Sequence, residues 1–422
     1  MRRNNLTLCI LACLQALTGI TQVPSIKTGA NKHIPLAMAQ YRSGEPHVAV
    51  NPNNPNHLLA AAMLLNPDEQ ADGPVVAFYS NDRGKNWKVH PFRFQSAADV
   101  WCIINEKGEG VISLLDGDRL WVFHSADGGR SWTDSTDLGR FHDHETMVRG
   151  KDATGREVIY LSSVQQVRQK NGSYPALFLA RSDDGGRTFP FRKTEVISNL
   201  QMNTMTPAVL SDGTLLLPFE QFAFRTASGY QRLEKSLSWL IKAAPGGMNW
   251  QPSHFITQSF GAGFPVMAVN SAAPWKDHIY WVGNSPDRQS ILLWQSADRG
   301  ATWSSTTVYQ STQLTVIPNV AVNRDGIIGI SFYERGLGAP FCQTYRFTVS
   351  ADGGRSFSPP VAVADQPSCP DKAKNGHLLN RGWASGGHYM ALVAMPEGGF
   401  FTIWADARTG AYQLYQAEIT LQ

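Results

Sequence analysis

The sequence predicts an all-β fold, a β-propeller of seven four-stranded blades, with six blades as the alternative. One observation is an eight-residue motif of the form Ser-x-Asp-x-Gly-x-(Ser/Thr/Asn)-(Trp/Phe), which occurs five times. Another is the spacing of the aromatic ends of the copies, which recur about 45 to 61 residues apart when Trp250 is included. The third is the set of strand-like segments between the copies, because supersecondary units repeated at such a period are typical of propellers. The copies occupy residues 80–87, 125–132, 182–189, 296–303 and 350–357.

The residue types of the motif predict a hairpin turn. Each copy follows an apolar, β-branched or aromatic run, as a turn between two strands would. Asp and Ser can bond nearby backbone N–H groups, Gly permits a positive φ, and the final aromatic ring can be buried against the next sheet. A degenerate sixth copy ends at Trp250, where Gly246 and Gly247 remain but the Ser and Asp are lost.

The end of the chain predicts how the ring closes. The seventh unit has three strand-like segments and no copy of the motif, so it lacks a fourth strand. The apolar segment 33–40 (HIPLAMAQ), which precedes the first unit, is expected to supply that strand and to close the ring without a covalent link. Residues 24–422 are therefore expected to form a single propeller domain.

The first 23 residues resemble an export signal. Arg2 and Arg3 precede the apolar run 6–20, which is too short to span a bilayer and is typical of a secretory signal peptide. A secreted or periplasmic protein is expected, and a loose lipoprotein box ending at Cys13 leaves lipid anchoring as the alternative. The rest of the chain holds no apolar run of about 18 residues, so no transmembrane segment is expected.

The composition limits the kinds of molecule that the protein is expected to bind. The chain has 37 Lys and Arg against 34 Asp and Glu and no basic stripe, so a nucleic-acid partner is not expected. Beyond the signal segment, Cys342 and Cys369 are close enough in sequence to pair, and Cys102 is expected to be a buried thiol. No CxxC or HExxH pattern occurs, so neither a metal nor a cofactor is predicted. A monomer is expected.

The repeated motif resembles the Asp box of BNR-repeat proteins in the sialidase (neuraminidase) superfamily. The resemblance covers nearly the whole chain after the signal segment, with five intact boxes and one degenerate box. It implies a propeller with the boxes on its outer rim and a functional site at the axial funnel, where the first strand of each blade begins. Asp boxes occur in hydrolases, lyases and non-catalytic propellers, so the motif alone does not identify the chemistry.

Likeness to sialidases implies specific site residues. In those enzymes three arginines bind the substrate carboxylate, a tyrosine paired with a glutamate is the nucleophile, and an aspartate is the general acid/base catalyst. The run GGHYMALVAMPEGGFFTIW places Tyr389 at the nucleophile position, and Arg335 matches an arginine that precedes an Asp box. Asp68 or Asp72, in the loop before the first box, matches the acid/base position. The third arginine could be Arg381 or Arg408.

The chain also departs from the sialidase pattern. It reads Gly44-Glu45-Pro46 where sialidases have Arg-Ile-Pro, and Arg42 lies two residues too early. No glutamate partner for Tyr389 is evident, and seven units replace the six blades of sialidases. Polar and aromatic residues near the starts of the first strands complete the candidate site. The candidate catalytic residues are Tyr389, Asp68, Asp72 and Glu145. The candidate substrate-binding residues are Arg42, Arg335, Arg381, Glu45, His47, Asp143, His144, His388 and Trp101.

The predicted function is that of a secreted, sialidase-like glycoside hydrolase of the exo-α-sialidase type, acting on acidic glycans. One alternative is a polysaccharide lyase, in which His or Tyr removes the proton next to a uronate carboxylate while Arg neutralises the acid. The other alternative is a propeller that binds glycan or protein without catalysis, with Trp101 and Tyr389 as stacking platforms.

Overall fold

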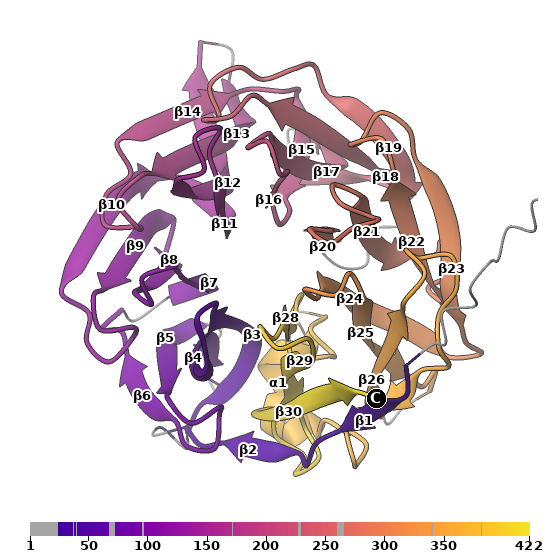
Figure 1. Ribbon diagram of the computed structural model, residues 1–422. Helices are drawn as coiled ribbons and strands as arrows, with labels where there is room; N and C mark the ends of the chain where they lie inside the picture. The colour runs from indigo at the N-terminus through magenta and orange to yellow at the C-terminus, as the bar shows by residue number, and fades with distance from the viewer. Residues whose placement is uncertain are drawn as a thin grey trace, which may run out of the picture.

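Seven antiparallel sheets surround a central axis in the computed structural model (Figure 1). The structure describes residues 24–36, 38, 40–66, 72–94, 97–170, 172–226, 229–259, 266–338, 341–380 and 382–422. The predicted signal segment, 1–23, lies outside these residues. The all-β class and the seven blades are confirmed, and the alternative of six blades is wrong.

The strands follow one another around the ring, and the first strand of each blade lies nearest the axis (Figure 1). Blade 1 comprises β3 (Arg42–Asn51), β4 (Asn54–Leu65), β5 (Asp72–Ser80) and β6 (Lys88–Pro91). Blade 2 comprises β7 (Ala97–Ile104), β8 (Gly110–Asp116), β9 (Arg119–Ser125) and β10 (Asp134–Arg140). Blade 3 comprises β11 (His142–Lys151), β12 (Glu157–Gln169), β13 (Gly172–Ser182) and β14 (Phe191–Glu195). Blade 4 comprises β15 (Leu200–Thr204), β16 (Ala208–Val209), β17 (Leu215–Thr226), β18 (Gly229–Ala243) and β19 (His254–Ser259).

The remaining blades follow the same plan. Blade 5 comprises β20 (Val266–Val269), β21 (Ile279–Asn284), β22 (Ser290–Ser296) and β23 (Ser304–Gln310). Blade 6 comprises β24 (Leu314–Val322), β25 (Ile328–Arg335), β26 (Gln343–Ser350) and β27 (Val361–Ala362). Blade 7 comprises β28 (Ala391–Ala394), β29 (Phe400–Asp406) and β30 (Gln413–Leu421), with β1 (Ile26–Thr28) and β2 (Lys32–Ile34) on its outer edge.

The eight-residue motifs form the turns between the third and fourth strands of their blades. In all five copies the Ser hydroxyl donates to the Asp carboxylate at 2.7–2.8 Å. The same hydroxyl accepts the backbone N–H of the Gly at the fifth position of the motif at 2.7–2.9 Å. The degenerate copy keeps a turn, in which the Trp250 indole donates to the Gly247 carbonyl at 2.9 Å. The Ser, Asp and Gly groups of the motif thus bond to one another within the turn.

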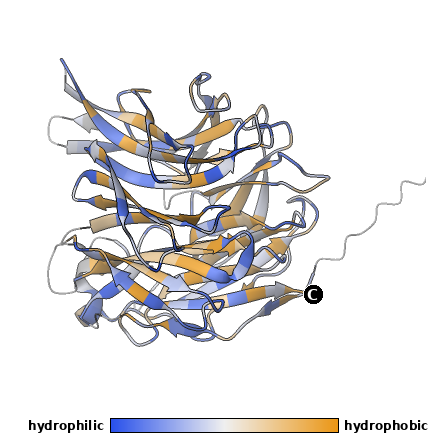
Figure 2. Cartoon of the chain, turned by 60° about the vertical axis from the view of Figure 1, so that its left-hand side comes forward, coloured by the Kyte–Doolittle hydropathy of each residue, from blue (hydrophilic) through white to orange (hydrophobic). Residues whose placement is uncertain are grey.

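The core consists of layers between neighbouring blades, because each sheet buries both faces. Phe189, the aromatic end of the blade 3 motif, is 1% exposed and packs with Val111 and Leu120 of blade 2. Trp87 and Trp132 pack against other interblade clusters. In Figure 2, hydrophobic stretches run along the strands, while hydrophilic stretches are frequent in the loops at both ends of the blades.

The N-terminal segment closes the ring, although its paired residues differ from the prediction. Strands β1 and β2 both pair with β30, so the first and last parts of the chain share one sheet. Within 33–40, only His33 and Ile34 pair, and the described residues beyond them are not in a strand. Pro35 lacks a backbone N–H and ends the pairing there. The pairing extends upstream instead, to Ile26.

A long connection between β27 and β28 folds over one side of the ring. It contains α1 (Lys372–Asn380), and the predicted disulfide between Cys342 and Cys369 is present, with the Cα atoms 4.2 Å apart. A disulfide is consistent with an extracellular protein. Cys102 is buried and free, as predicted. Among the described residues, no helix is long and apolar enough to cross a membrane.

Candidate functional site

Backbone irregularities mark one end of the axis. Four first strands change register near their starts, and at each change a non-glycine residue has a left-handed backbone. Such bulges redirect side chains, and the strained conformation is often found at functional sites. The four residues, with their φ angles, are Glu45 (49°), Asp99 (37°), His144 (52°) and Ile317 (53°). We call this end of the propeller the funnel face.

Two histidines face each other there, and each lies beside a carboxylate. His388 donates its backbone N–H to Glu45 at 2.8 Å, and its Nδ1 lies 3.4 Å from the same carboxylate oxygen. Glu45 is 1% exposed. A Cβ on Gly387 would lie 2.1 Å from Glu45 Cγ, so only glycine permits this close contact between blades 7 and 1. The ring centroids of His388 and His144 are 6.3 Å apart.

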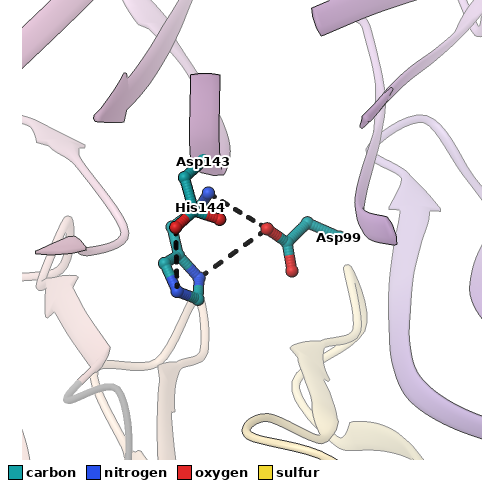
Figure 3. A group of neighbouring side chains, drawn as sticks. All are labelled: Asp99, Asp143 and His144. Atoms are coloured by element: carbon teal, nitrogen blue, oxygen red, sulfur yellow. Dashed lines mark hydrogen bonds and ion pairs between the residues drawn. The ribbon is translucent and has the colours of Figure 1, made fainter. Parts of the chain in front are cut away.

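His144 lies between two aspartates (Figure 3). Its backbone N–H donates to Asp99 Oδ2 at 3.0 Å, and its Nδ1 is 3.7 Å from the same oxygen. On the other side, its Nε2 is 3.9 Å from Asp143 Oδ2. A carboxylate at Nδ1 fixes the orientation of an imidazole ring and leaves the remaining nitrogen for proton exchange.

The histidines open into a cavity of about 440 Å³ on the funnel face. Trp383 and Ser385, from the long connection between β27 and β28, form one wall. Three arginines from successive blades line other parts of it: Arg232 on β18, Arg288 in the turn between β21 and β22, and Arg335 at the end of β25.

Arg288 and Arg335 are adjacent positive charges. Burial and the charge of Arg288 together lower the pKa of Arg335. The turn that carries Arg288 is fixed to blade 6, because its carbonyl accepts the Thr315 N–H at 2.6 Å. Within the part of the chain that the structure describes, neither guanidinium forms an ion pair or a hydrogen bond. Two neighbouring guanidinium groups in a cavity can bind a carboxylate or another anion.

A smaller cavity of about 40 Å³ lies deeper along the axis. It is lined by Tyr389, Glu145, His47 and Trp101, among others. A volume of this size holds a few water molecules and is too small for a sugar ring. These four predicted site residues therefore lie below the funnel cavity.

Burial shifts the pKa values of Tyr389, His47 and Glu145 in this deeper layer towards their uncharged forms. The Tyr389 hydroxyl accepts the Val100 N–H at 3.1 Å, and burial and the charges of Glu45 and Asp99 hold its pKa well above the usual value. Burial lowers the pKa of His47 to about 3. The pKa of Glu145 is raised well above its usual value, first by burial and then by the charge of Asp99. An uncharged tyrosine bonded to the backbone is a poor nucleophile.

The structure separates the other predicted residues. Arg42 donates from Nε to the carbonyl of Lys374 in α1 at 3.0 Å and does not line the funnel cavity. Arg408 forms an ion pair with Asp406 at 2.8 Å and stacks on a tyrosine ring, so both of these contacts of its guanidinium lie within blade 7. Asp68 and Arg381 lie outside the described residues. Asp72 begins β5, and its side chain is not described.

Sequence reasoning found Arg335 but missed Arg232 and Arg288. Neither belongs to a repeated motif. The available signal was their position in the hairpins between the second and third strands of blades 4 and 5, since these hairpins border the funnel face. A search of those hairpins for cations would have found both.

One group of residues at this site has the composition of a metal site. Potential ligand atoms of Asp99, Asp143 and His144 all lie within 4.8 Å of one another (Figure 3). Carboxylate and imidazole groups suit several divalent ions. The direct hydrogen bond from the His144 N–H to Asp99 accounts for part of this grouping without a metal.

Comparisons with known proteins support the fold. No family model matches the chain, and no curated protein is similar to it. Among solved structures, an ulvan lyase of a polysaccharide lyase family, bound to GlcA(1-4)Rha3S, matches with a TM-score of 0.54 and 11% identity. That match covers 91% of this chain and 95% of the lyase. The endosialidase of phage phi92 matches with a TM-score of 0.52 and 12% identity, over 93% of this chain and 69% of that one. At these identities the chain shares a β-propeller fold with carbohydrate-active proteins.

Proposed function

We propose that the protein binds an acidic polysaccharide in the funnel cavity and cleaves it by β-elimination next to a uronate carboxylate. The observation that carries this proposal is the pair Arg288 and Arg335, unpartnered among the described residues, in one cavity with His144 and His388. The pair supplies the positive charge that a carboxylate requires. The imidazoles supply ring nitrogens that can accept or donate a proton.

The reaction requires these residues to bind the carboxylate, to remove a proton and to protonate the leaving oxygen. The arginine pair binds the uronate carboxylate, which stabilises the negative charge that develops when the adjacent carbon loses its proton. One imidazole, in its neutral form, removes that proton. The carbon–oxygen bond at the next carbon then breaks, a carbon–carbon double bond forms, and the second imidazole protonates the leaving oxygen. Asp99 and Glu45 lie beside the Nδ1 atoms of the two rings, at 3.7 Å from His144 and 3.4 Å from His388.

Hydrolysis of sialosides is the second candidate. Three arginines line the cavity, as recognition of a sialic acid carboxylate requires in the enzymes that the motif resembles. The position of Tyr389 argues against it, because the hydroxyl is hydrogen-bonded to Val100 below the cavity. A protein that only binds glycans would use the same arginines without proton transfer.

The test is a panel of uronate polysaccharides and α-sialosides, with ultraviolet absorbance and new reducing ends measured together. β-Elimination yields both signals, because it leaves an unsaturated uronate, whereas hydrolysis yields reducing ends alone. Arg335→Met should weaken kcat/KM or binding about 10- to 100-fold, as expected for a lost charge-assisted contact. The control is Arg324→Met, an equal change of charge at a side chain that is 64% exposed, forms an ion pair with its neighbour Asp325 and donates to the Pro396 carbonyl at 3.3 Å. Unchanged binding by Arg335→Met would contradict the proposal.

A further inference from the structure

The disulfide lies next to the strand end that carries Arg335. Gln343, the first residue of β26, pairs with Arg335, the last residue of β25. Cys342 directly precedes Gln343 and is bonded to Cys369 in the long connection between β27 and β28. The disulfide therefore joins the hairpin that carries an anion-binding arginine to the segment that forms one wall of the funnel cavity.

Gln343 contacts the same connection in two further ways. Its backbone forms both hydrogen bonds of an antiparallel bridge with Ser368, each at 2.9 Å. Its side-chain Oε1 accepts the Ser385 hydroxyl at 2.7 Å, and both side chains are buried, where water does not compete for the bond. One glutamine thus binds the connection at a point before α1 and at a point after it.

The contact after α1 is adjacent to groups of the proposed reaction. Trp383, two residues before Ser385, lines the funnel cavity and packs edge-on against His388, with the ring centroids 5.1 Å apart. Gly386, directly after Ser385, accepts the backbone N–H of Glu45 at 3.1 Å. The position of the Ser385 segment therefore affects the placement of the histidine and of the carboxylate beside it.

Packing alone does not explain a glutamine at position 343. Among the residues that the structure describes, the buried Nε2 of Gln343 has no hydrogen-bond partner. An unpaired buried donor costs free energy that an apolar side chain of similar volume would not cost. The hydrogen bond to Ser385 is therefore the interaction that favours glutamine here.

We propose that Gln343 is a positioning residue of the funnel cavity and that the disulfide between Cys342 and Cys369 holds it in place. This inference rests on the proposed function and deepens it, because it makes affinity for the acidic polysaccharide depend on the oxidised state of the two cysteines. A dithiol breaks the sulfur–sulfur bond by two exchange steps, which leave two cysteine thiols and oxidise the dithiol to its own disulfide. Both cysteines are partly exposed, so a dithiol can reach them.

The experiment measures dissociation constants for glucuronate and for uronate oligosaccharides by titration calorimetry. Gln343→Met keeps the volume of the side chain but removes the acceptor, and it should weaken binding about 3- to 30-fold. The matched control is Gln416→Met, because Gln416 is also buried, accepts the Trp87 indole N–H at 2.9 Å and does not line the funnel cavity. The control should lose a similar free energy of unfolding and keep its affinity.

Two further measurements separate positioning from general stability. Ser385→Ala combined with Gln343→Met should weaken binding no more than the larger single change, because both substitutions remove one hydrogen bond. Reduction of the wild type by a dithiol should also weaken binding. The double variant Cys342→Ser/Cys369→Ser should show the same loss without the dithiol and no response to it.

The outcomes distinguish this inference from the proposed function. If the oxidised wild type binds none of the ligands, the proposed function fails. If it binds them and neither Gln343→Met nor reduction changes the dissociation constant of the folded protein, the positioning role is refuted. An equal loss of affinity in Gln416→Met would refute it as well. Gln343→Met leaves the disulfide intact, so it remains informative if the reduced protein unfolds.

Discussion

Replacing Tyr389 with Phe removes one hydroxyl group from the layer below the funnel cavity. That hydroxyl accepts the backbone N–H of Val100 at 3.1 Å and lies 3.5 Å from the Val100 carbonyl. Val100 is fully buried, next to the register change in β7. In the variant, its N–H is left without this acceptor in a place that water reaches poorly.

The expected cost follows from that unsatisfied donor. Leaving a buried donor unpaired costs about 1–3 kcal/mol. Tyr160→Phe is the matched control, because the Tyr160 hydroxyl accepts the Gly246 N–H at 3.2 Å and does not line the funnel cavity. Both variants should lose a similar free energy of unfolding. Tyr389→Phe should keep most of the kcat on an acidic polysaccharide, since the pKa of Tyr389 is raised and the hydroxyl is held away from the cavity.

The assay combines urea denaturation with steady-state kinetics. The midpoint and slope of unfolding give the stability change, and kcat and KM are measured on the same preparations. Loss of turnover in Tyr389→Phe with no change in stability would refute this reasoning. It would instead support the nucleophile role that the resemblance to sialidases implies.

Two further predictions concern stability. Burial and the charges of Asp99 and Asp143 raise the pKa of Glu145 in the folded protein. Protonated Glu145 therefore contributes to the stability of the folded state at low pH. This contribution is lost as the pH rises from the unfolded pKa of about 4.3 through the pKa of the folded state. Glu145→Gln should therefore gain stability relative to the wild type with rising pH in urea titrations, and a constant difference would contradict this. Ile34→Ala should cost about 2–4 kcal/mol, because the side chain is fully buried where the ring closes. Lys32→Ala, at an exposed position of β2, should cost less than about 0.5 kcal/mol, and equal losses would argue against closure through this strand.

Local patterns made the fold predictable. Each eight-residue motif satisfies its own hydrogen bonds, so its sequence specifies the turn without help from the rest of the chain. The period of these turns then gives the number of blades. The closing strand was harder to predict, because apolar character alone does not show where Pro35 ends the pairing with β30.

The candidate site was only partly predictable. Arg335 was identified because it precedes a motif, and His144 and His388 because they lie near the starts of first strands. Arg42 does not line the funnel cavity, because its side chain binds the Lys374 carbonyl of α1, and its position along the strand does not reveal this contact. Arg288 belongs to no repeated motif, so only its position in the hairpin between the second and third strands of blade 5 could have indicated it.

The sequence by itself determined the propeller and its turns, because these depend on contacts that are local or that repeat, whereas it showed only that Cys342 and Cys369 are close enough in sequence to pair. Only the tertiary structure shows which charged and titratable side chains lie close together. Arg288 and Arg335 come from different blades, as do His144 and His388, and their distances depend on how whole sheets pack around the axis. A register change at the start of β11 sets the direction of the His144 side chain. Such changes follow from the packing of each strand against its neighbours, and residue order does not encode them in any short pattern.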